Sequence, residues 1–409
     1  MKRILITGLC LVGNKGGPAM AISIISELKK IIKDVEFVIA VPAGSNYCEE
    51  EKKARFYNIK IVKRVLLSDF YFKVLFKNFY VQVKKIFKYF SVYNSADIIL
   101  NLSGISYVGE PEGKIYDVLG SQRFFNFLQF LIFRKSFFAW SQNYGPLNPN
   151  FVRFLAKWDL KHQRLIFCRG IETKRMIVDL MIGQKNILNV PDIAFKLPFG
   201  KREGEDYIKN ILGCDLKRKI VTISPSFVLY RLTGEDHIRK IQSYIRYLIN
   251  KSYYVILVPH SYFSQQDKVE NCDYLISKSI FESLSEEENI KDFLFLVKED
   301  LDVIMLKSLI SNAYIHIGAR YHSIVASTST NVPTICLSWH KKYVDIMYEF
   351  KMNEFVIEYD SYDKFVDIFD KLEERHDIYV KNMKKYNAMI NKKISRSIKM
   401  FIKLYGDKI

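Results

Sequence analysis

The stretch Ile315-His-Ile-Gly-Ala-Arg-Tyr-His-Ser-Ile-Val-Ala-Ser-Thr-Ser-Thr-Asn-Val-Pro-Thr-Ile-Cys-Leu-Ser-Trp-His-Lys-Lys-Tyr343 decides how this chain folds around its candidate site. Residues 313–317 lead into Gly318 as a buried strand would, and residues 332–338 have the pattern of the next strand. Between them, residues 323–330 are typical of a helix of small side chains that can pack close to a sheet. Strand, helix and strand in this order predict a parallel α/β sheet.

Charged side chains follow both predicted strands. Arg320 and His322 lie at the strand-to-helix turn, where a helix start offers unpaired N–H groups and positive dipole charge to an anion. Lys341 and Lys342 follow the second strand at its carboxyl end, where ligands of open α/β sheets bind. We therefore expect Arg320, His322 and Lys342 to converge on an anion. The alternative is that these charges only keep two loops solvated. For the pair Lys341 and Lys342, anion binding and simple solvation are equally supported by the sequence.

Length, charge and cysteine usage narrow the class of protein. The chain has 409 residues, enough for two α/β domains with full cores. A formal net charge of +18 predicts attraction to nucleic acid, to a membrane surface or to a phosphorylated substrate. The six cysteines are scattered singly without a CxxC pair, which indicates reduced thiols in a cytoplasm and no zinc site.

The amino-terminal residues predict the start of a doubly wound domain. Residues 3–8 and 35–41 are predicted strands, residues 9–18 a glycine-rich turn and residues 19–30 a helix. The glycines do not follow GxGxxG spacing, so dinucleotide binding is unsupported. A close backbone approach to a ligand is still expected between Gly13 and Gly17.

Two apolar runs raise the question of targeting or membrane insertion. The run at residues 4–12 follows two basic residues and resembles a signal peptide, but it is short and meets a glycine-rich turn, which favours a buried strand. The run at residues 124–133 is too short to span a bilayer. We expect no membrane-spanning segment.

The predicted domains are residues 1–197 and residues 205–370, with a linker candidate at 196–205. In the first domain, strands within residues 95–104, 137–146 and 164–169 end in polar loops that would form one wall of a cleft, and they carry Gln142 and Arg169. The second domain begins with a strand at 219–225, and His260 follows its next strand, at residues 253–259.

Two segments combine basic and apolar residues at helical spacing. Residues 66–89 place aromatic and aliphatic side chains on one helical face beside a stripe of lysines, as in helices that lie on anionic bilayers. An ordinary helix packed in the domain core is the slightly favoured alternative. In residues 371–409, the apolar positions predict a terminal helix docked on the body, with a basic outer face near an anionic partner as the alternative. The lysines of the first segment are Lys73, Lys77, Lys84 and Lys88.

The order of these motifs resembles the polysaccharide pyruvyl transferase family, and the two predicted halves resemble the GT-B architecture, two Rossmann-like domains facing across a cleft. The resemblance runs from the first strand to about residue 350, and its most specific part is Gly-x-Arg-x-His-Ser with Val-Pro and a later lysine. The motifs are Gly13-Asn14, residues 142–146, Arg169, Pro191-Asp192, Ser224-Pro225, Pro259-His260, Gly318 to Ser323, Val332-Pro333 and Lys342.

The resemblance implies transfer of an enolpyruvyl unit from phosphoenolpyruvate to a sugar, giving a pyruvate ketal and phosphate. The donor carries a phosphate and a carboxylate, which Arg169, Arg320 and Lys342 would clamp. His322 would act as the acid that protonates the methylene carbon. No cofactor or metal is required. The expected substrate-binding residues are Asn14, Gly17, Gln142, His260 and Ser323.

The acceptor implied is a sugar of a surface polysaccharide or its lipid-linked precursor. A cytoplasmic enzyme acting at the inner face of the membrane would then use the basic stripe of residues 66–89. The first alternative is a GT-B glycosyltransferase that uses a nucleotide sugar, with Asp345 or Glu349 available to bind the ribose. The second is a non-catalytic basic scaffold or nucleic-acid binder, but no nucleic-acid signature is visible.

Overall fold

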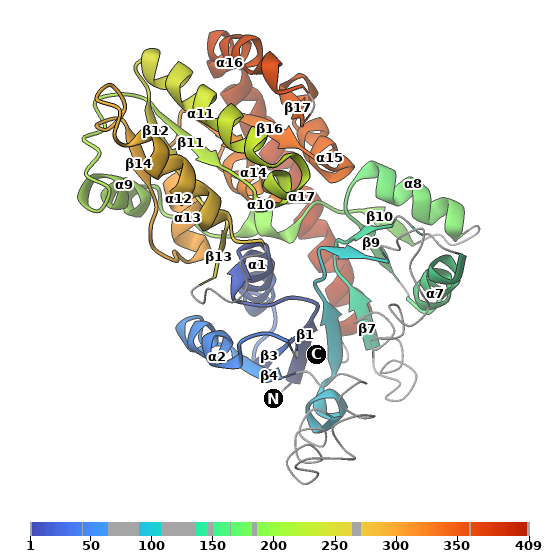
Figure 1. Cartoon of the computed structure of the whole chain (residues 1–409). Coiled ribbons are helices and arrows are strands. Elements are labelled where there is room, and N and C mark those ends of the chain that lie inside the picture. Colours follow the sequence, from blue (N-terminus) through green and yellow to red (C-terminus); the bar gives the residue numbers. More distant parts are fainter. Residues whose placement is uncertain are drawn as a thin grey trace. The chain divides into compact units, whose positions relative to one another are not determined.

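The computed structural model describes residues 2–42, 44–63, 90–107, 136–145, 147, 150–163, 165–181, 186–263, 271–359 and 361–406. The basic segment 66–89, with its four lysines, and the apolar run 124–133 lie outside these residues. The chain divides into two compact units, and Figure 1 labels many of their elements. Unit 1 comprises Met1–Val12, Met20–Ile193 and Lys393–Ile409, and unit 2 comprises Gly13–Ala19 and Ala194–Lys392.

Unit 1 is built on a five-stranded parallel sheet in the order β4-β3-β1-β5-β7. Its central strands are buried along most of their length, as expected where both faces of a parallel sheet are covered. The predicted strand at residues 35–41 is confirmed. The strands are β1 (Lys2–Thr7), β3 (Val35–Val41), β4 (Lys60–Lys63), β5 (Ile98–Asn101) and β7 (Ser136–Ala139).

Smaller parallel pairs extend unit 1 beyond this sheet. Strand β9 pairs with β10, and β6 pairs with β8. Their apolar residues form a core cluster with the helices α7 and α8. The elements are β6 (Ile105–Ser106), β8 (Asn143–Tyr144), β9 (Ile166–Cys168), β10 (Ile187–Asn189), α2 (Tyr47–Phe56), α7 (Asn150–Lys161) and α8 (Ile171–Leu180).

Unit 2 is built on a six-stranded parallel sheet in the order β14-β12-β11-β15-β16-β17. Every residue of the four central strands is buried. The two flanks of the opening stretch are therefore core strands, as the sequence predicts. The strands are β11 (Ile220–Ser224), β12 (Tyr254–Leu257), β14 (Leu294–Leu296), β15 (Ile315–Gly318), β16 (Thr334–Ser338) and β17 (Val356–Glu358).

Helices join the strands of unit 2, so that each central strand is followed by a helix start at the carboxyl edge of the sheet. Among them, α14 is the predicted helix of small residues. The helices are α9 (Lys201–Asn210), α10 (Phe227–Thr233), α11 (Glu235–Asn250), α12 (Asp273–Leu284), α13 (Val303–Ile310), α14 (Tyr321–Ser329), α15 (Lys341–Glu349) and α16 (Phe365–Glu374), with 3₁₀ turns η1 (Ile193–Lys196), η2 (Asn353–Phe355) and η3 (Tyr362–Lys364).

Helices α1 (Gly16–Lys29) and α9 begin inside segments that the sequence predicts to be a turn and a linker. Helix α1 starts inside the expected turn 9–18, because the side-chain Oδ1 of Asn14 accepts a hydrogen bond from the N–H of Gly16 at 2.9 Å. Helix α9 begins at Lys201, so the second half of the expected linker 196–205 is helical. There Gly204 packs against Ser308 of α13 so closely that a Cβ would lie 2.1 Å from the Ser308 carbonyl oxygen.

The carboxyl-terminal segment folds as one long helix, α17 (His376–Tyr405), which contributes residues to both units. Met383, Ile390, Ile394 and Phe401 of its predicted apolar stripe are buried, so this stripe does dock on the protein. Two residues that the helical period assigns to the stripe are exposed instead, because they lie at its margin. These residues are Met389 and Leu404.

Candidate functional site

The turn between β15 and α14 is held by tight local packing. Gly318 allows the turn because a Cβ there would lie within 3 Å of Ile324 and Ser323. Arg320 is the N-cap residue of α14, and the hydroxyl of Ser323 donates to the Arg320 carbonyl oxygen at 2.9 Å. His322 therefore lies in the first turn of α14, at the carboxyl edge of the sheet, as the sequence predicts.

The glycine-rich segment near the amino terminus belongs to the same unit as this turn. Strand β2 (Gly13–Asn14) pairs antiparallel with β13 (Ser261–Tyr262), directly after His260. The backbone N–H of Lys15 also donates to the carbonyl oxygen of His260, at 3.1 Å. These bonds place the amino-terminal end of α1 beside His260.

Gly16 lies directly against the imidazole of His322. A Cβ at Gly16 would come within 2.2 Å of the ring atom Nδ1 of His322, so only glycine permits this approach. Gly17, the expected ligand-binding glycine, is the next residue of α1 and is half-buried. Asn14 is exposed, and its Oδ1 caps the helix.

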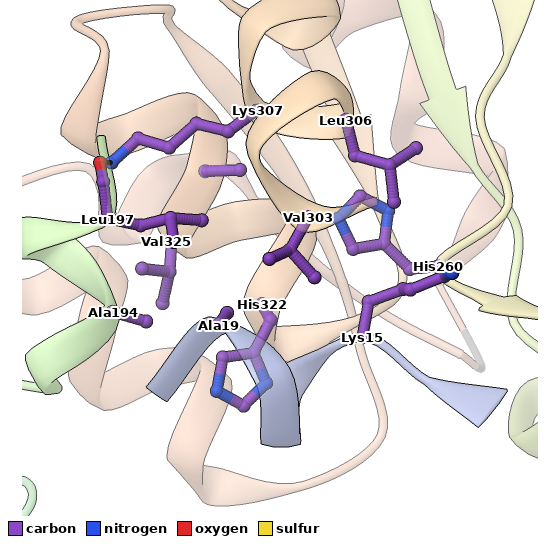
Figure 2. Close-up of a pocket in the computed structure, with 11 residues that line it drawn as sticks. Lys15, Ala19, Ala194, Leu197, His260, Val303, Leu306, Lys307, His322 and Val325 are labelled. Carbon is purple, nitrogen blue, oxygen red and sulfur yellow. Dashed lines mark hydrogen bonds between the residues drawn. The ribbon is translucent and has the colours of Figure 1, made fainter. Parts of the chain in front are cut away.

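A pocket inside unit 2 brings together four basic side chains, two predicted as site residues and two not (Figure 2). His322 and His260 are the predicted ones, and Lys15 and Lys307 are new. The empty space amounts to about 290 Å³, of which about 20 Å³ admits the centre of a water-sized sphere. The pocket as it stands therefore holds roughly one water, or one end of a ligand. The other lining residues are Ala19, Ala194, Leu197, Val303, Leu306, Val325 and Ala326.

Burial controls the charge of two of these side chains. The pKa of His260, which is 4 % exposed, is lowered well below its ordinary value, first by burial and then by electrostatic interaction with His316, His322 and Lys15. Burial also lowers the pKa of Lys307 to about 7. His260 is therefore neutral at physiological pH, and Lys307 is only partly charged.

The two lysines of the pocket are held by other loops of unit 2. The amine of Lys15 forms an ion pair with Asp300 and donates to the carbonyl oxygen of Leu301 at 2.7 Å. The amine of Lys307 donates to the carbonyl oxygens of Leu197, at 2.8 Å, and Phe195, at 3.3 Å. Figure 2 shows the Lys307 amine against the Leu197 carbonyl, so it fixes the wall of the pocket.

Arg320 is engaged by a carboxylate that sequence reasoning missed. Its Nε and Nη2 donate to the two carboxylate oxygens of Asp273, at 2.7 Å and 2.5 Å. Asp273 is fully buried at the start of α12, and the Arg320 side chain is 12 % exposed. Burial raises the pKa of Asp273, and the charge of Arg320 partly opposes this shift. The arginine therefore reaches any ligand as half of an ion pair.

Lys342 lies in the first turn of α15, which follows β16. His340 caps this helix, since its ring Nδ1 accepts from the backbone N–H of Lys342 at 3.2 Å. The amine of Lys342 lies 4.7 Å from the ring centre of Trp339 and 5.3 Å from that of Tyr343, within range of cation–π attraction. Lys342 thus follows the carboxyl end of its strand as predicted, but it does not line the pocket of Figure 2.

The two predicted site residues of unit 1 are buried and lie side by side. The Arg169 guanidinium forms an ion pair with Asp192 and donates to the side chain of Asn143 at 2.7 Å and to the Gly104 carbonyl at 2.6 Å. The backbone N–H of Arg169 donates to the carbonyl of Gln142 at 2.9 Å. The expected clamp of the donor by Arg169 stays a prediction. In the structure, this guanidinium already has a carboxylate partner, Asp192, inside unit 1.

The described residues contain no cluster of His, Cys, Asp or Glu side chains able to hold a metal ion. Within the same residues, no helix combines the length and the apolar character that crossing a bilayer requires. The site built by this part of the chain therefore consists of histidine, lysine, an arginine–aspartate pair and helix starts.

Solved structures similar to this chain share its fold at low sequence identity. They include UDP-GlcNAc 2-epimerase from Neisseria meningitidis bound to UDP-GlcNAc (11 % identity, TM-score 0.59, covering 97 % of this chain and 100 % of that one). A glycosyltransferase from Rickettsia africae is 12 % identical with a TM-score of 0.58, and the match covers 100 % of this chain and 98 % of that one. Anabaena HepE in complex with UDP-glucose is 11 % identical with a TM-score of 0.57, and the match covers 98 % of this chain and 100 % of that one. These likenesses and the two parallel sheets confirm the predicted GT-B-like α/β fold.

Sequence comparison identifies the family. No curated protein matches the chain. The family model for polysaccharide pyruvyl transferase matches residues 14–341, which include the turn with Arg320 and His322, the residue Asp273 and all residues that line the pocket. This match covers well over half of the chain and confirms the resemblance drawn from the motifs. The protein is therefore a member of the polysaccharide pyruvyl transferase family, which is a family of enzymes.

Proposed function

We propose that this enzyme transfers the enolpyruvyl unit of phosphoenolpyruvate to a sugar and forms a pyruvate ketal. The observation that carries the proposal is the convergence, within unit 2, of His322 and the amino-terminal end of α1 on one pocket of a chain that belongs to this family. Arg320 is the N-cap of the helix that carries His322. Two helix starts and basic side chains suit a small, doubly charged anion.

The donor matches the charge of the site. Phosphoenolpyruvate has an anionic group at each end, and the pocket has room for one end only. We place one end beside His322 and the other over the start of α14, where Arg320 keeps N–H groups that Asp273 does not use. Lys342 supplies a second charge from the neighbouring helix start.

The proton transfers follow from the reaction. Two C–O bonds form between sugar hydroxyls and C2 of the donor, and the C–O bond to phosphate breaks. One hydroxyl proton ends on C3, which becomes a methyl group, and the other leaves with the phosphate. His322 is the side chain that delivers the proton to C3, and neutral His260 is a hydrogen-bond partner for the bound substrate. Neither step asks for a metal or another cofactor.

The first test separates donor classes. Phosphoenolpyruvate at about 100 times its dissociation constant should stabilise the fold by roughly 3 kcal/mol, because a ligand that binds only the folded state shifts unfolding by mass action. We expect a rise in melting temperature with phosphoenolpyruvate, which Arg320→Ala removes, and none with UDP-, GDP- or CDP-sugars. A rise with one nucleotide sugar alone would contradict the proposal and favour glycosyl transfer, with Asp345 or Glu349 as the ribose ligand.

The acceptor that we propose is a sugar of a surface polysaccharide or its lipid-linked precursor, reached at the inner face of an anionic membrane. The basic stripe of residues 66–89 would hold the enzyme there.

Charge reversal of that stripe tests the membrane contact. Changing its four lysines (Lys73, Lys77, Lys84 and Lys88) to glutamate should abolish sedimentation with liposomes that contain anionic lipid. The matched control applies the same charge change to four exposed lysines of α17, and it should still sediment. Equal losses in both variants would point to net charge alone, and binding that survives in the first would rule the stripe out. The control lysines are Lys381, Lys384, Lys385 and Lys392.

A further inference from the structure

Asp273 occupies a position that neither its own helix nor the pocket explains. It is the first residue of α12, its side chain is fully buried, and it lies outside the lining of the pocket. A buried carboxylate is costly unless each oxygen finds hydrogen-bond donors. The donors that Asp273 has found come from three different loops at the carboxyl edge of the sheet.

Each of these loops follows one central strand of unit 2. After β11, the backbone N–H of Phe227 donates to Oδ1 of Asp273 at 2.9 Å. After β12, the backbone N–H of His260 also faces this carboxylate and lowers its pKa. After β15, Arg320 donates through Nε and Nη2. A single carboxylate thus joins the loops that carry His260 and Arg320, the second of which leads into His322.

The geometry of the ion pair leaves one side of Arg320 available. Asp273 takes the fork formed by Nε and Nη2, and Nη2 has a further, long contact of 3.4 Å with the carbonyl oxygen of Asn271. Arginine has five N–H groups, and among the residues that the structure describes none accepts from Nη1, so its two N–H groups are offered to an oxyanion. Because Asp273 holds both Nε and Nη2, the plane of the guanidinium is fixed, and the direction in which Nη1 points is fixed with it.

We propose that Asp273 is a positioning residue for the donor site: through its bidentate pair with Arg320 it aims the Nη1 edge of that guanidinium at an anionic group of the donor. The inference rests on the proposed function for the identity of the donor. It assigns Arg320 a dual role, since the same side chain closes the loop network and binds the ligand.

The test is a double-mutant cycle on donor binding. Dissociation constants for phosphoenolpyruvate are measured by calorimetry for the unchanged chain, Asp273→Asn, Arg320→Ala and the double variant. We expect each single change to weaken binding at least tenfold, and the double variant to bind as weakly as Arg320→Ala and no weaker, because Asp273 acts through Arg320. Losses that multiply in the double variant, or donor binding that is unchanged in Asp273→Asn, would overturn the inference.

Two further variants separate positioning from folding. Asp273→Asn leaves a buried guanidinium without its counter-charge and can unfold the protein, so Asp273→Asn/Arg320→Gln is measured as well, because it removes both charges together. We expect it to melt near the unchanged chain and to bind the donor as weakly as Arg320→Ala. Full donor affinity in this variant would contradict the inference. Asp292→Asn, an exposed aspartate of unit 2, is the matched control and should change neither quantity.

Steady-state kinetics give a readout that a purely structural role would not produce. If Asp273 aims the donor-binding arginine, Asp273→Asn should raise the KM for phosphoenolpyruvate more than it lowers kcat, and Asp273→Glu should recover part of the loss. A loss in kcat alone would count against positioning.

Inorganic phosphate, titrated in parallel, distinguishes this inference from the proposed function. An unchanged chain that binds phosphate but not phosphoenolpyruvate would contradict the proposed donor, and the same cycle is then run with phosphate. Binding of neither anion would overturn both.

Discussion

The His322→Gln variant is expected to lose about 10²- to 10⁴-fold in kcat while it binds phosphoenolpyruvate nearly as well as the unchanged chain. Glutamine keeps a polar side chain of similar length beside Gly16, but it cannot deliver a proton to the methylene carbon.

Phosphate release from phosphoenolpyruvate in the presence of acceptor measures this effect, and calorimetry measures donor binding separately. His162→Gln is the control, because His162 is an exposed histidine at the end of α7. A variant with normal kcat would show that another group protonates the donor. Loss of donor affinity without loss of kcat would instead make His322 a binding residue.

The sequence predicted those helices and strands that form because of the residues within them. The alternation into Gly318 and the small residues of the following segment predicted β15 and α14, and the structure confirms both. The helix begins two residues earlier than expected, at Tyr321, because backbone capping at Arg320 is not visible in an apolar pattern. Placement of Arg320 and His322 at the carboxyl edge followed from the order of strand and helix alone.

The partners of these residues could not be read in the same way. Asp273 lies 47 residues before Arg320, and in the sequence it is one acidic residue among many. Asp300 and Lys15 are separated by 285 residues. Such ion pairs depend on which loops the sheet brings together, and no local pattern encodes that. A partial signal existed for Lys307, since a lysine within the apolar run of α13 is unusual.

The amino-terminal glycines illustrate the same limit. Periodicity assigned residues 9–18 to the turn after the first strand, but α1 already begins at Gly16. Their association with unit 2 comes from pairing of Gly13 and Asn14 with Tyr262 and Ser261, across some 250 residues of sequence. A strand pair of only two residues on each side, so far apart in the sequence, produces no hydrophobic periodicity from which it could be predicted.

Lys307 provides the second large effect, on the pH dependence of stability. Burial lowers its pKa to about 7, whereas the unfolded chain restores the ordinary value of 10.5. Between these two values the unfolded state binds a proton that the folded state does not, so the free energy of unfolding rises with pH. At about 1.4 kcal/mol per unit, Lys307 should add about 3 kcal/mol between pH 7 and 9.5.

Lys307→Met should therefore separate from the unchanged chain as the pH rises. Methionine fills similar space without a charge, but it leaves the carbonyls of Phe195 and Leu197 without their donor, which costs stability at every pH. The gap in melting temperature between the two proteins should be smallest near pH 7, where the buried charge offsets those hydrogen bonds, and should widen toward pH 9.5. Lys291→Met, at an exposed lysine of the same unit, should follow the unchanged chain throughout. Parallel curves for Lys307→Met and the unchanged chain would mean that the amine keeps its proton in the folded state, which would require an anionic group in the pocket to neutralise it.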